Sequence, residues 1–268
     1  MFPAIFRKLK QSVTHLSKQF NLIPKKTHPQ GRPLKITPED ALTLALYQHR
    51  STRATKKSVW EDFKDELACS YKTLVVAMNR MAMAAVRLLF ILMRLGKNHA
   101  HLVKYTDATD IPVCLPKNAR RYQTLRGYAS WGHSGKGWYY GLKLTITRDA
   151  KGQLLGLRFS APGTNDRDIF RRINAEIDGI IVADSGYVSK QLEQDMHIEG
   201  KRWVLIKPYR TMKKLMTSWQ YHLYNSRFQI EFDFRNLKMF HGLVSSLPRS
   251  VDGMMLNWIF ALTSFVLA

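Results

Sequence analysis

Hydrophobic and polar residues follow a helical period over Tyr221–His241, late in the chain. When this stretch is wound at about 100° per residue, one group of apolar positions falls within an arc of roughly 60°. These positions are Leu223, Ile230, Phe234 and Leu237. A second arc of about 60° lies beside the first and carries polar residues, which are Tyr224, Arg227, Glu231 and Lys238. The pattern predicts a helix with a buried stripe and a charged edge.

The charged edge of this helix has two interpretations. Arg227 and Glu231 stand four residues apart, so they form a surface ion pair worth a few tenths of a kcal/mol. Alternatively, the edge belongs to a functional site, because an ion buried without a partner costs several kcal/mol. The helix alone does not choose between the two interpretations.

Helical periodicity also marks the N-terminal third of the chain. Thr37 is a suitable N-cap, because Pro38 follows at the first helical position and a carboxylate follows at Asp40. Further helices are predicted over 59–67 and 71–95. The region 37–98 is either a helix-turn-helix-like DNA-binding region or a plain helical bundle with a basic exterior.

The residues before this region have a different composition. Residues 23–35 are rich in Pro, Gly and Lys, which is typical of a linker. Residues 1–36 are therefore predicted as a basic N-terminal segment and linker.

From about residue 100 the period changes to that of strands. Strands are predicted over 102–113, 138–148, 154–160, 179–184 and 202–206. Helices are predicted over 166–177, 189–197, 221–241 and 254–266. The stretch Arg120–Lys136 is predicted as a basic loop. The order β-β-β-α-β-α-β-α predicts an α/β domain over 99–268, with a mixed sheet and helices on its faces.

Charge then narrows the class of partner. The chain has 42 Lys and Arg against 20 Asp and Glu, a net charge of +22, with a pI near 10.1. Such a surplus favours a polyanionic partner, most often nucleic acid, with an anionic membrane surface as the lesser alternative. The most apolar segments are shorter than the roughly 20 residues that span a bilayer, so they are predicted as core helices and no membrane partner is expected.

The start of the chain and its cysteines bear on location. The first residues, MFPAIFRKLKQSV, lack the apolar core of a signal peptide, so a cytoplasmic protein is expected. Cys69 and Cys114 are far apart in sequence. They suit a reducing compartment and exclude a multi-cysteine zinc site.

Two aspartates lie at or near the ends of predicted strands. Asp107 is near the end of the first predicted strand, and Asp184 ends the fourth. If these strands are neighbours and the helix with Glu231 packs across them, three carboxylates meet, and they need cations such as Mg²⁺. Two such ions roughly 4 Å apart are suited to phosphodiester chemistry. Asp110 is a rival for Asp107, since the two point to opposite faces and strand pleating prefers neither.

The spacing Tyr224-x2-Arg227-x3-Glu231-x6-Lys238 resembles the signature of a large group of bacterial insertion-sequence DDE transposases. DATDIPVC (Asp107–Cys114) resembles the first-aspartate strand of that group, and IVADSGY (Ile181–Tyr187) resembles its second-aspartate segment. YYGLKLTI and SAPGTNDRD resemble the stretch between the two aspartates. The likeness runs from about residue 100 to 245. Asn165 departs from it, because the related segment often has His before the aspartate that stands here at Asp166.

The resemblance implies an RNase H-like catalytic domain with Asp107, Asp184 and Glu231 as catalytic residues and metal ligands, and it favours Asp107 over Asp110. It implies two Mg²⁺ ions, with Mn²⁺ as a substitute. Arg227 and Lys238 would contact terminal DNA phosphates, and Tyr224 would position DNA or stack on a base.

The implied function is DNA transposition, in which metal-dependent cleavage at transposon ends precedes strand transfer. The implied partners are double-stranded terminal inverted repeats and target DNA, bound by a homodimer or higher assembly in the bacterial cytoplasm at the nucleoid. A non-catalytic DNA-binding derivative and a structure-selective nuclease of the same fold are the alternatives.

One basic and aromatic stretch stays open. Three cations and three rings follow one another from the predicted loop into the second predicted strand, and they are Arg120, Arg121, Arg126, Trp131, Trp138 and Tyr139. They form either a DNA track or a solvated loop with core aromatics.

Overall fold

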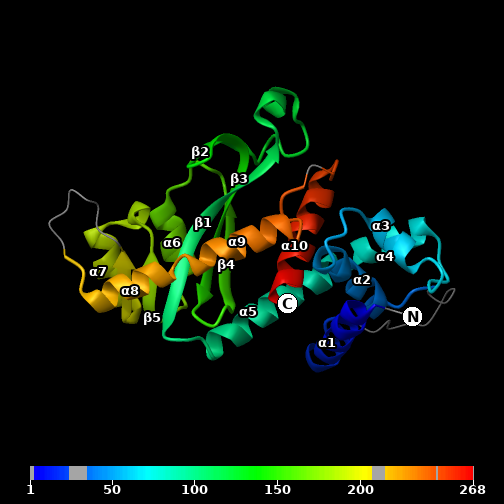
Figure 1. The fold of residues 1–268 in the computed structure, drawn as a ribbon, viewed down its shortest axis with the longest axis horizontal. Helices are drawn as coiled ribbons and strands as arrows, with labels where there is room; N and C mark the ends of the chain where they lie inside the picture. Colours follow the sequence, from blue (N-terminus) through cyan, green and yellow to red (C-terminus); the bar gives the residue numbers. More distant parts are fainter. Residues whose placement is uncertain (1–2, 24–34, 207–214, 246, 268) are drawn as a thin grey trace. The chain divides into compact units, whose positions relative to one another are not determined.

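The computed structural model describes residues 3–23, 35–206, 215–245 and 247–267 (Figure 1). The chain divides into two compact units. The first comprises Met1–Leu92 and Asn236–Ala268, and the second comprises Met93–Arg235. The predicted linker over 23–35 falls almost wholly outside the described residues.

The first unit is helical. Its helices are α1 (Ala4–Phe20), α2 (Pro38–Arg50), α3 (Lys56–Phe63), α4 (Tyr71–Arg80), the start of α5 (Ala82–Asn98) and α10 (Val251–Val266). Every residue of α2 from Ala41 to His49 is buried, so this helix forms the centre of the unit. The core around it includes Phe6, Phe63 and Phe260. The helix α1 was not predicted from the sequence.

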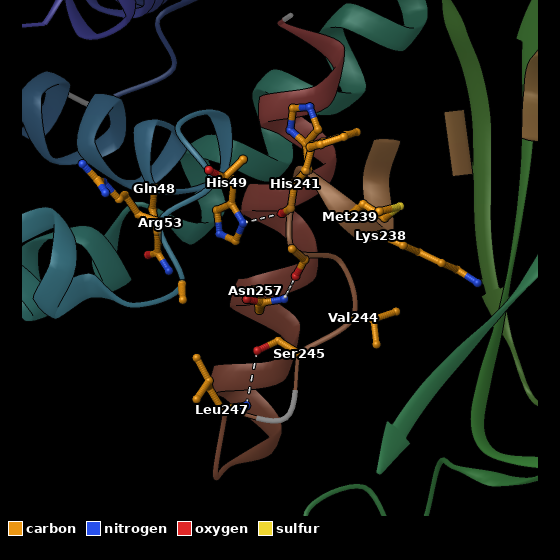
Figure 2. A pocket seen from close by; sticks show the side chains of 14 residues that line it. Gln48, His49, Arg53, Lys238, Met239, His241, Val244, Ser245, Leu247 and Asn257 are labelled. Carbon is orange, nitrogen blue, oxygen red and sulfur yellow. Dashed lines mark hydrogen bonds between the residues drawn. The ribbon is translucent and has the colours of Figure 1, made fainter. Parts of the chain in front are cut away.

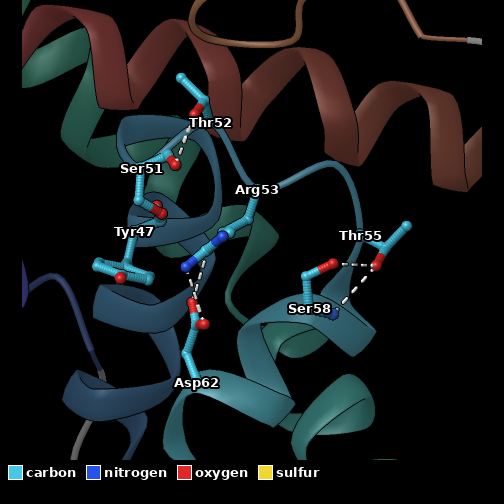
Figure 3. A network of polar contacts seen from close by, with 7 residues as sticks. All are labelled: Tyr47, Ser51, Thr52, Arg53, Thr55, Ser58 and Asp62. Atoms are coloured by element: carbon cyan, nitrogen blue, oxygen red, sulfur yellow. Dashed lines mark hydrogen bonds and ion pairs between the residues drawn. The ribbon is translucent and has the colours of Figure 1, made fainter.

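Side-chain caps start α2, α3, α4 and α10 of this unit. Thr37 accepts a hydrogen bond from the backbone N–H of Asp40 at 3.1 Å, as the sequence predicted. Thr55 caps α3 in the same way by accepting from Ser58 (Figure 3). Between the two helices, Arg53 makes a bidentate contact with Asp62 at 2.7 and 2.9 Å. The polar turns are therefore fixed by specific contacts.

The helix predicted over 71–95 is two helices. Met81 ends α4 and the chain bends by 42° before α5. Leu74 and Met78 of α4 and Ala85 and Leu88 of α5 are buried in the core of the unit. Among the described residues, no single helix has the length and apolar character to cross a membrane, although α4 and α5 taken together pass on those two criteria.

Two histidines join α2 to the segment before α10. The Nδ1 atom of His49 lies 2.8 Å from the backbone carbonyl oxygen of His241 (Figure 2). Asn257 of α10 donates to the carbonyl of the next residue, Gly242, at 2.9 Å. Burial lowers the pKa of His49 to about 4, although the hydrogen bond to His241 works in the opposite direction. Both histidines are therefore neutral in the folded protein at pH 7, because burial also lowers the pKa of His241 to about 4.

The second unit is built on a mixed six-stranded sheet. Its strands are β1 (Val103–Cys114), β2 (Ser130–Ser134), β3 (Gly137–Asp149), β4 (Leu154–Ser160), β5 (Gly179–Ala183) and β6 (Arg202–Ile206). The main order is β2-β3-β1-β5-β6, and β4 pairs with β3. β1 is antiparallel to β3 and parallel to β5, so the prediction of a mixed sheet is confirmed.

Helices flank this sheet. They are α6 (Asp166–Ile173), α7 (Lys190–Gly200), α8 (Ser218–Ser226) and α9 (Gln229–Met239), with short 3-10 helices η1 (Pro116–Arg121) and η2 (Ser185–Tyr187). The sequence analysis missed β2, which lies in the stretch predicted as a loop. Its five residues include a glycine and two serines, and such residues give little strand signal.

The two faces of β1 carry different chemistry. Thr106 points to one face, where its hydroxyl lies 2.8 Å from that of Thr147 and both contact the Asn174 amide. Tyr105 points to the other face, where its hydroxyl lies 2.8 Å from that of Ser226 at the end of α8. Asp107 shares the face of Tyr105, since side chains alternate along a strand.

Candidate active site

The register of two parallel strands aligns the two aspartates. Val103 pairs with Ile180 and Tyr105 pairs with Val182, along β1 and β5. Continuing that register by two residues brings Asp107 level with Asp184, just beyond the end of β5. Asp184 is held there as the cap of η2, because its Oδ1 accepts the backbone N–H of Ser185 at 2.8 Å. The neighbouring strands on which the sequence-based site depended are thus present.

The helix predicted over 221–241 is interrupted where it passes the site. α8 ends at Ser226 and α9 begins at Gln229. The hydroxyl of Ser226 donates to the carbonyl of Leu223 at 2.7 Å. In a regular helix the N–H of Arg227 would take that carbonyl, but here it bonds to Tyr224 at 3.1 Å. Serine competition for backbone groups therefore explains the break.

Arg227 and Tyr224 connect all three predicted carboxylates. The Nη1 atom of Arg227 donates to Oδ2 of Asp107 at 2.5 Å, and its Nη2 donates to Oε1 of Glu231 at 3.2 Å. The hydroxyl of Tyr224 donates to Oδ1 of Asp184 at 3.1 Å. The structure therefore brings five of the six predicted site residues into one connected group.

Exposure differs sharply within this group. The side chains of Asp107 and Arg227 are 18% and 12% exposed, whereas that of Glu231 is 60% exposed. Arg227 Nε is buried and has no hydrogen-bond partner among the described residues. The site is thus a buried ion pair with one carboxylate open to solvent.

The electrostatics link the carboxylates to one another. Burial raises the pKa of Asp107 to about 6, with Arg227 opposing this shift and the charges of Asp184 and Glu231 adding to it. The pKa of the buried Tyr187 hydroxyl is also raised, first by burial and then by Asp107. Burial is the main cause of both shifts, but Asp184 and Glu231 lie near enough to Asp107 to add to its shift, so the group attracts cations.

A metal ion would have to share this space with Arg227. Among the described residues, no three His, Cys, Asp or Glu side chains lie close enough together to hold one ion. The guanidinium of Arg227 contacts both Asp107 and Glu231 and supplies the neutralising charge. The donors fit a hard divalent cation, because carboxylate oxygens are the ligands that such ions prefer. In this arrangement Arg227, rather than an ion, balances the charge of Asp107 and Glu231.

A buried ion pair holds α9 against the sheet. Nη1 of Arg148, on β3, donates to Oδ2 of Asp233 at 2.7 Å, and both side chains are largely buried. Ile230, Phe234 and Leu237 of the predicted apolar stripe are also buried, and Leu223 is half-buried. Sequence reasoning missed the ion pair, since nothing in one sequence links positions so far apart. Together these contacts fix the backbone that carries Glu231.

The rival aspartate lies on the opposite face of β1. Asp110 pairs in register with Lys143. Its charge, with that of Asp166, adds to the burial that raises the pKa of Tyr139 to about 12. The Nζ atom of Lys143 contacts Asp166 and also donates to the carbonyl of Thr164 at 3.1 Å. Asp110 thus shares the face of Lys143, whereas Asp107 shares the face of Tyr105.

Two residues of the region stand apart from the sequence-based expectation. Lys238 is the sixth predicted site residue, and the structure groups it with the first unit, where it lines a pocket with His49 and Asn257 (Figure 2). Tyr187 was not predicted as a site residue, yet its pKa responds to Asp107 and Asp184. Its position three residues after Asp184, on one short 3-10 turn, is the signal that could have found it.

Comparisons with known proteins give a consistent result. A family model described as "Transposase DDE domain" matches residues 97–250. The cryo-EM structure of the piggyBac transposase synaptic complex with hairpin DNA is similar over 99% of this chain and 72% of that chain, with 9% identity and a TM-score of 0.55. The likeness shows a shared fold, and the predicted RNase H-like fold with an N-terminal helical region is confirmed.

Two further solved structures are similar over most of the chain at lower TM-scores. The crystal structure of the Mos1 mariner paired end complex with Mn is similar over 94% of this chain and 83% of that chain, with 12% identity and a TM-score of 0.26. A pre-cleavage Mos1 transpososome is similar over 99% and 98%, with 9% identity and a TM-score of 0.23. No curated protein matches the chain.

Proposed function

Because the chain belongs to the family of transposase DDE domains, we propose that this DNA transposase cuts the ends of its element and joins them to target DNA. The single observation that supports this chemistry is the group in which Arg227 and Tyr224 contact Asp107, Asp184 and Glu231. In this proposal the three carboxylates are the catalytic residues.

Divalent ions belong to the chemistry of this family. The finer proposal is two Mg²⁺ ions, replaceable by Mn²⁺, with Asp107, Asp184 and Glu231 as their ligands. Such ions supply an activated attacking oxygen and a stabilised leaving oxygen. The protein positions the ligands. η2 orients Asp184, and the contact of Arg148 with Asp233 holds the helix α9 that carries Glu231.

DNA contacts are assigned to the cations and the phenol of the signature. An Arg227 that releases Asp107 or Glu231 has a guanidinium free to contact a phosphate, for which its planar fork is well suited. Tyr224 then positions DNA or stacks on a base, and Lys238 contacts a further phosphate. The net charge of +22 supports a polyanionic partner in general.

The finer identity follows the signature spacing. We place the chain in the insertion-sequence group with Tyr224-x2-Arg227-x3-Glu231-x6-Lys238, acting on terminal inverted repeats as a homodimer or higher assembly in the bacterial cytoplasm at the nucleoid. The region 37–98 is proposed to bind DNA, after a basic segment and linker over 1–36, and 99–268 is proposed as the catalytic region.

The test is cleavage of linear DNA that carries the element's ends, with Mg²⁺ or Mn²⁺. Asp107→Ala, Asp184→Ala and Glu231→Ala should each lower cleavage by at least about 1,000-fold while leaving DNA binding largely intact. Glu199→Ala is the matched control, because Glu199 also pairs with an arginine in this unit. Full cleavage by any of the three variants would overturn the assignment, and cutting without joining would indicate a nuclease instead.

A further inference from the structure

A folded lobe separates β1 from β3. We define the aromatic lobe as residues 115–140, which comprise η1, the following turns, β2 and the start of β3. Figure 1 shows its first part in green beyond the ends of β1 and β3. Ala119, Leu125 and Ala129 are buried in it. The lobe therefore combines buried and exposed side chains, as a folded segment does.

Four rings share one face of the hairpin in this lobe. Trp131 pairs in register with Tyr140, and His133 pairs with Trp138. The ring centroids within these two pairs are 5.7 and 5.2 Å apart. Side chains alternate along a strand, so the buried Tyr139 points to the other face. The result is a ladder of edge-to-face rings along one side of β2 and β3.

The two tryptophans of the ladder are exposed. Trp138 is 67% exposed and Trp131 is 47% exposed. Leaving such large apolar rings in water forgoes the favourable free energy of burying them. Neighbouring exposed tryptophans of this kind are typical of a binding surface.

The charge of the lobe identifies the partner. From Ile111 to Arg148 the sequence contains no aspartate or glutamate. Within the lobe the basic side chains are all exposed, and they are Lys117, Arg120, Arg121, Arg126 and Lys136. Cations around exposed rings, with no acidic residue among them, complement a polyanion whose units carry flat aromatic groups. Nucleic acid has both properties.

The register gives the distance from the candidate active site. Cys114 of β1 pairs with Tyr140, the inner ring of the ladder, and Asp107 lies seven residues earlier on the same strand. At about 3.4 Å per residue the separation is at most roughly 24 Å. Because the rise of duplex DNA is about 3.4 Å per base pair, this span corresponds to about seven base pairs.

We propose that the aromatic lobe binds an unpaired stretch of DNA about seven nucleotides from the phosphate that is cleaved. Bases stack on Trp131 and Trp138, and the lobe's cations hold the phosphates. Unpaired DNA fits better than duplex, because a duplex shows its bases only edge-on in the grooves and leaves no face free to stack. The location of the cleaved phosphate rests on the proposed function, whereas the binding activity of the lobe does not.

Binding is tested with the full-length chain in EDTA, so that no cleavage occurs. The probe is a fluorescently labelled 20-nucleotide thymidine strand, and the readout is anisotropy. Trp138→Ala and Trp131→Ala should each raise Kd by about fivefold or more, and Trp138→Tyr should restore most of the affinity, since it keeps a stacking ring. Trp203→Ala is the control, because Trp203 is 60% exposed and also contacts a histidine ring in this unit.

A second arm tests the cations. Arg120→Gln and Arg126→Gln should each reduce the slope of log Kd against log salt by about 0.7, the value for one single-strand phosphate contact. Unchanged affinity in the Trp131→Ala/Trp138→Ala variant, or an equal loss in Trp203→Ala, would overturn the proposal. A loss of affinity that is seen only with a duplex probe of the same length would also overturn the proposal.

These outcomes are separate from those of the catalytic test. If the lobe binds unpaired DNA but the wild-type chain cuts no ends, the proposed function fails and the binding surface stands. If the chain cuts ends and the tryptophan variants bind the thymidine strand normally, the binding surface fails and the proposed function stands. Near-ultraviolet circular dichroism of each variant checks that the fold is retained.

Discussion

The two faces of β1 differ by a single step along the chain. Thr106 points into a neutral network with Thr147 and Asn174, in which all three side chains are buried and hydrogen-bonded to one another. Asp107 points into a charged group in which one guanidinium contacts two carboxylates. The Thr106 network is complete within the protein, whereas the group around Asp107 has more negative groups than cations to match them.

This difference distinguishes polar groups that stabilise the fold from polar groups that can bind a ligand. A satisfied neutral network contributes to stability and has nothing left to offer a ligand. A buried charge pair adds little stability, because desolvation offsets its Coulombic attraction. Changes in the charged group are therefore expected to affect activity, and changes in the neutral network are expected to affect folding.

The largest expected effect is on activity. Glu231→Gln removes one exposed charge and keeps the size of the side chain, so the free energy of unfolding should change by less than about 0.5 kcal/mol. Cleavage of DNA ends should fall by about 1,000-fold or more. Glu199→Gln should leave both quantities unchanged. A large loss of thermal stability in Glu231→Gln would show that this face is structural after all.

Next comes the ion pair that carries α9. Arg148→Met leaves the carboxylate of Asp233 buried without its partner, which should cost about 3–5 kcal/mol of unfolding free energy in urea titrations. Adding Asp233→Leu should recover most of that loss, because two apolar side chains then replace the pair. If the single variant is as stable as the wild type, the pair does not anchor the helix.

Acid should turn a neutral buried pair into a charged one in the first unit. The folded pKa values of His49 and His241 are about 4, below the unfolded value of about 6.5. The unfolded state therefore takes up protons first, and stability that is complete above pH 6.5 falls as the pH drops towards 4. For His49 alone the loss is at most about 3 kcal/mol.

The melting temperature measured between pH 7 and pH 4 tests this expectation. His49→Asn keeps a hydrogen-bond donor near the carbonyl of His241 but does not titrate, so its melting temperature should depend less steeply on pH. Equal pH dependence in the variant and the wild type would contradict the expectation.

The smallest expected effect concerns the neutral network itself. Asn174→Ala removes an amide that bonds to two threonine hydroxyls and to the backbone of Phe170. The cost should be about 1–3 kcal/mol of unfolding free energy. Cleavage per folded molecule should stay unchanged, which is the opposite of the result expected for Glu231→Gln. Loss of cleavage in a folded Asn174→Ala would erase the distinction between the two faces.

Apart from β2 and the division of the last helix into α8 and α9, the order of strands and helices in the second unit could be predicted from the sequence, because strands and helices differ in period. The meeting of Asp107 and Asp184 could also be predicted, on the condition that their strands are neighbours, which the structure meets. Both inferences need only local patterns and general rules of sheet topology.

Other features depend on contacts that one sequence does not reveal. The break after Ser226 arises from a hydroxyl that also meets Tyr105, far away in the chain. The helix α10 was counted with the residues from 99 onward, whereas the structure groups it with the first unit, where Phe260 packs in the core. An apolar helix shows that it will be buried but not where.

The contact of Arg227 with two carboxylates has a consequence for how the protein matures. A site that depended on metal for charge balance would remain self-repelling until ions arrived. Here an internal counter-ion lets the newly made chain reach its final shape in an ion-poor setting and wait there. If the three carboxylates hold metal ions, as proposed, chelation should abolish cleavage without unfolding the protein.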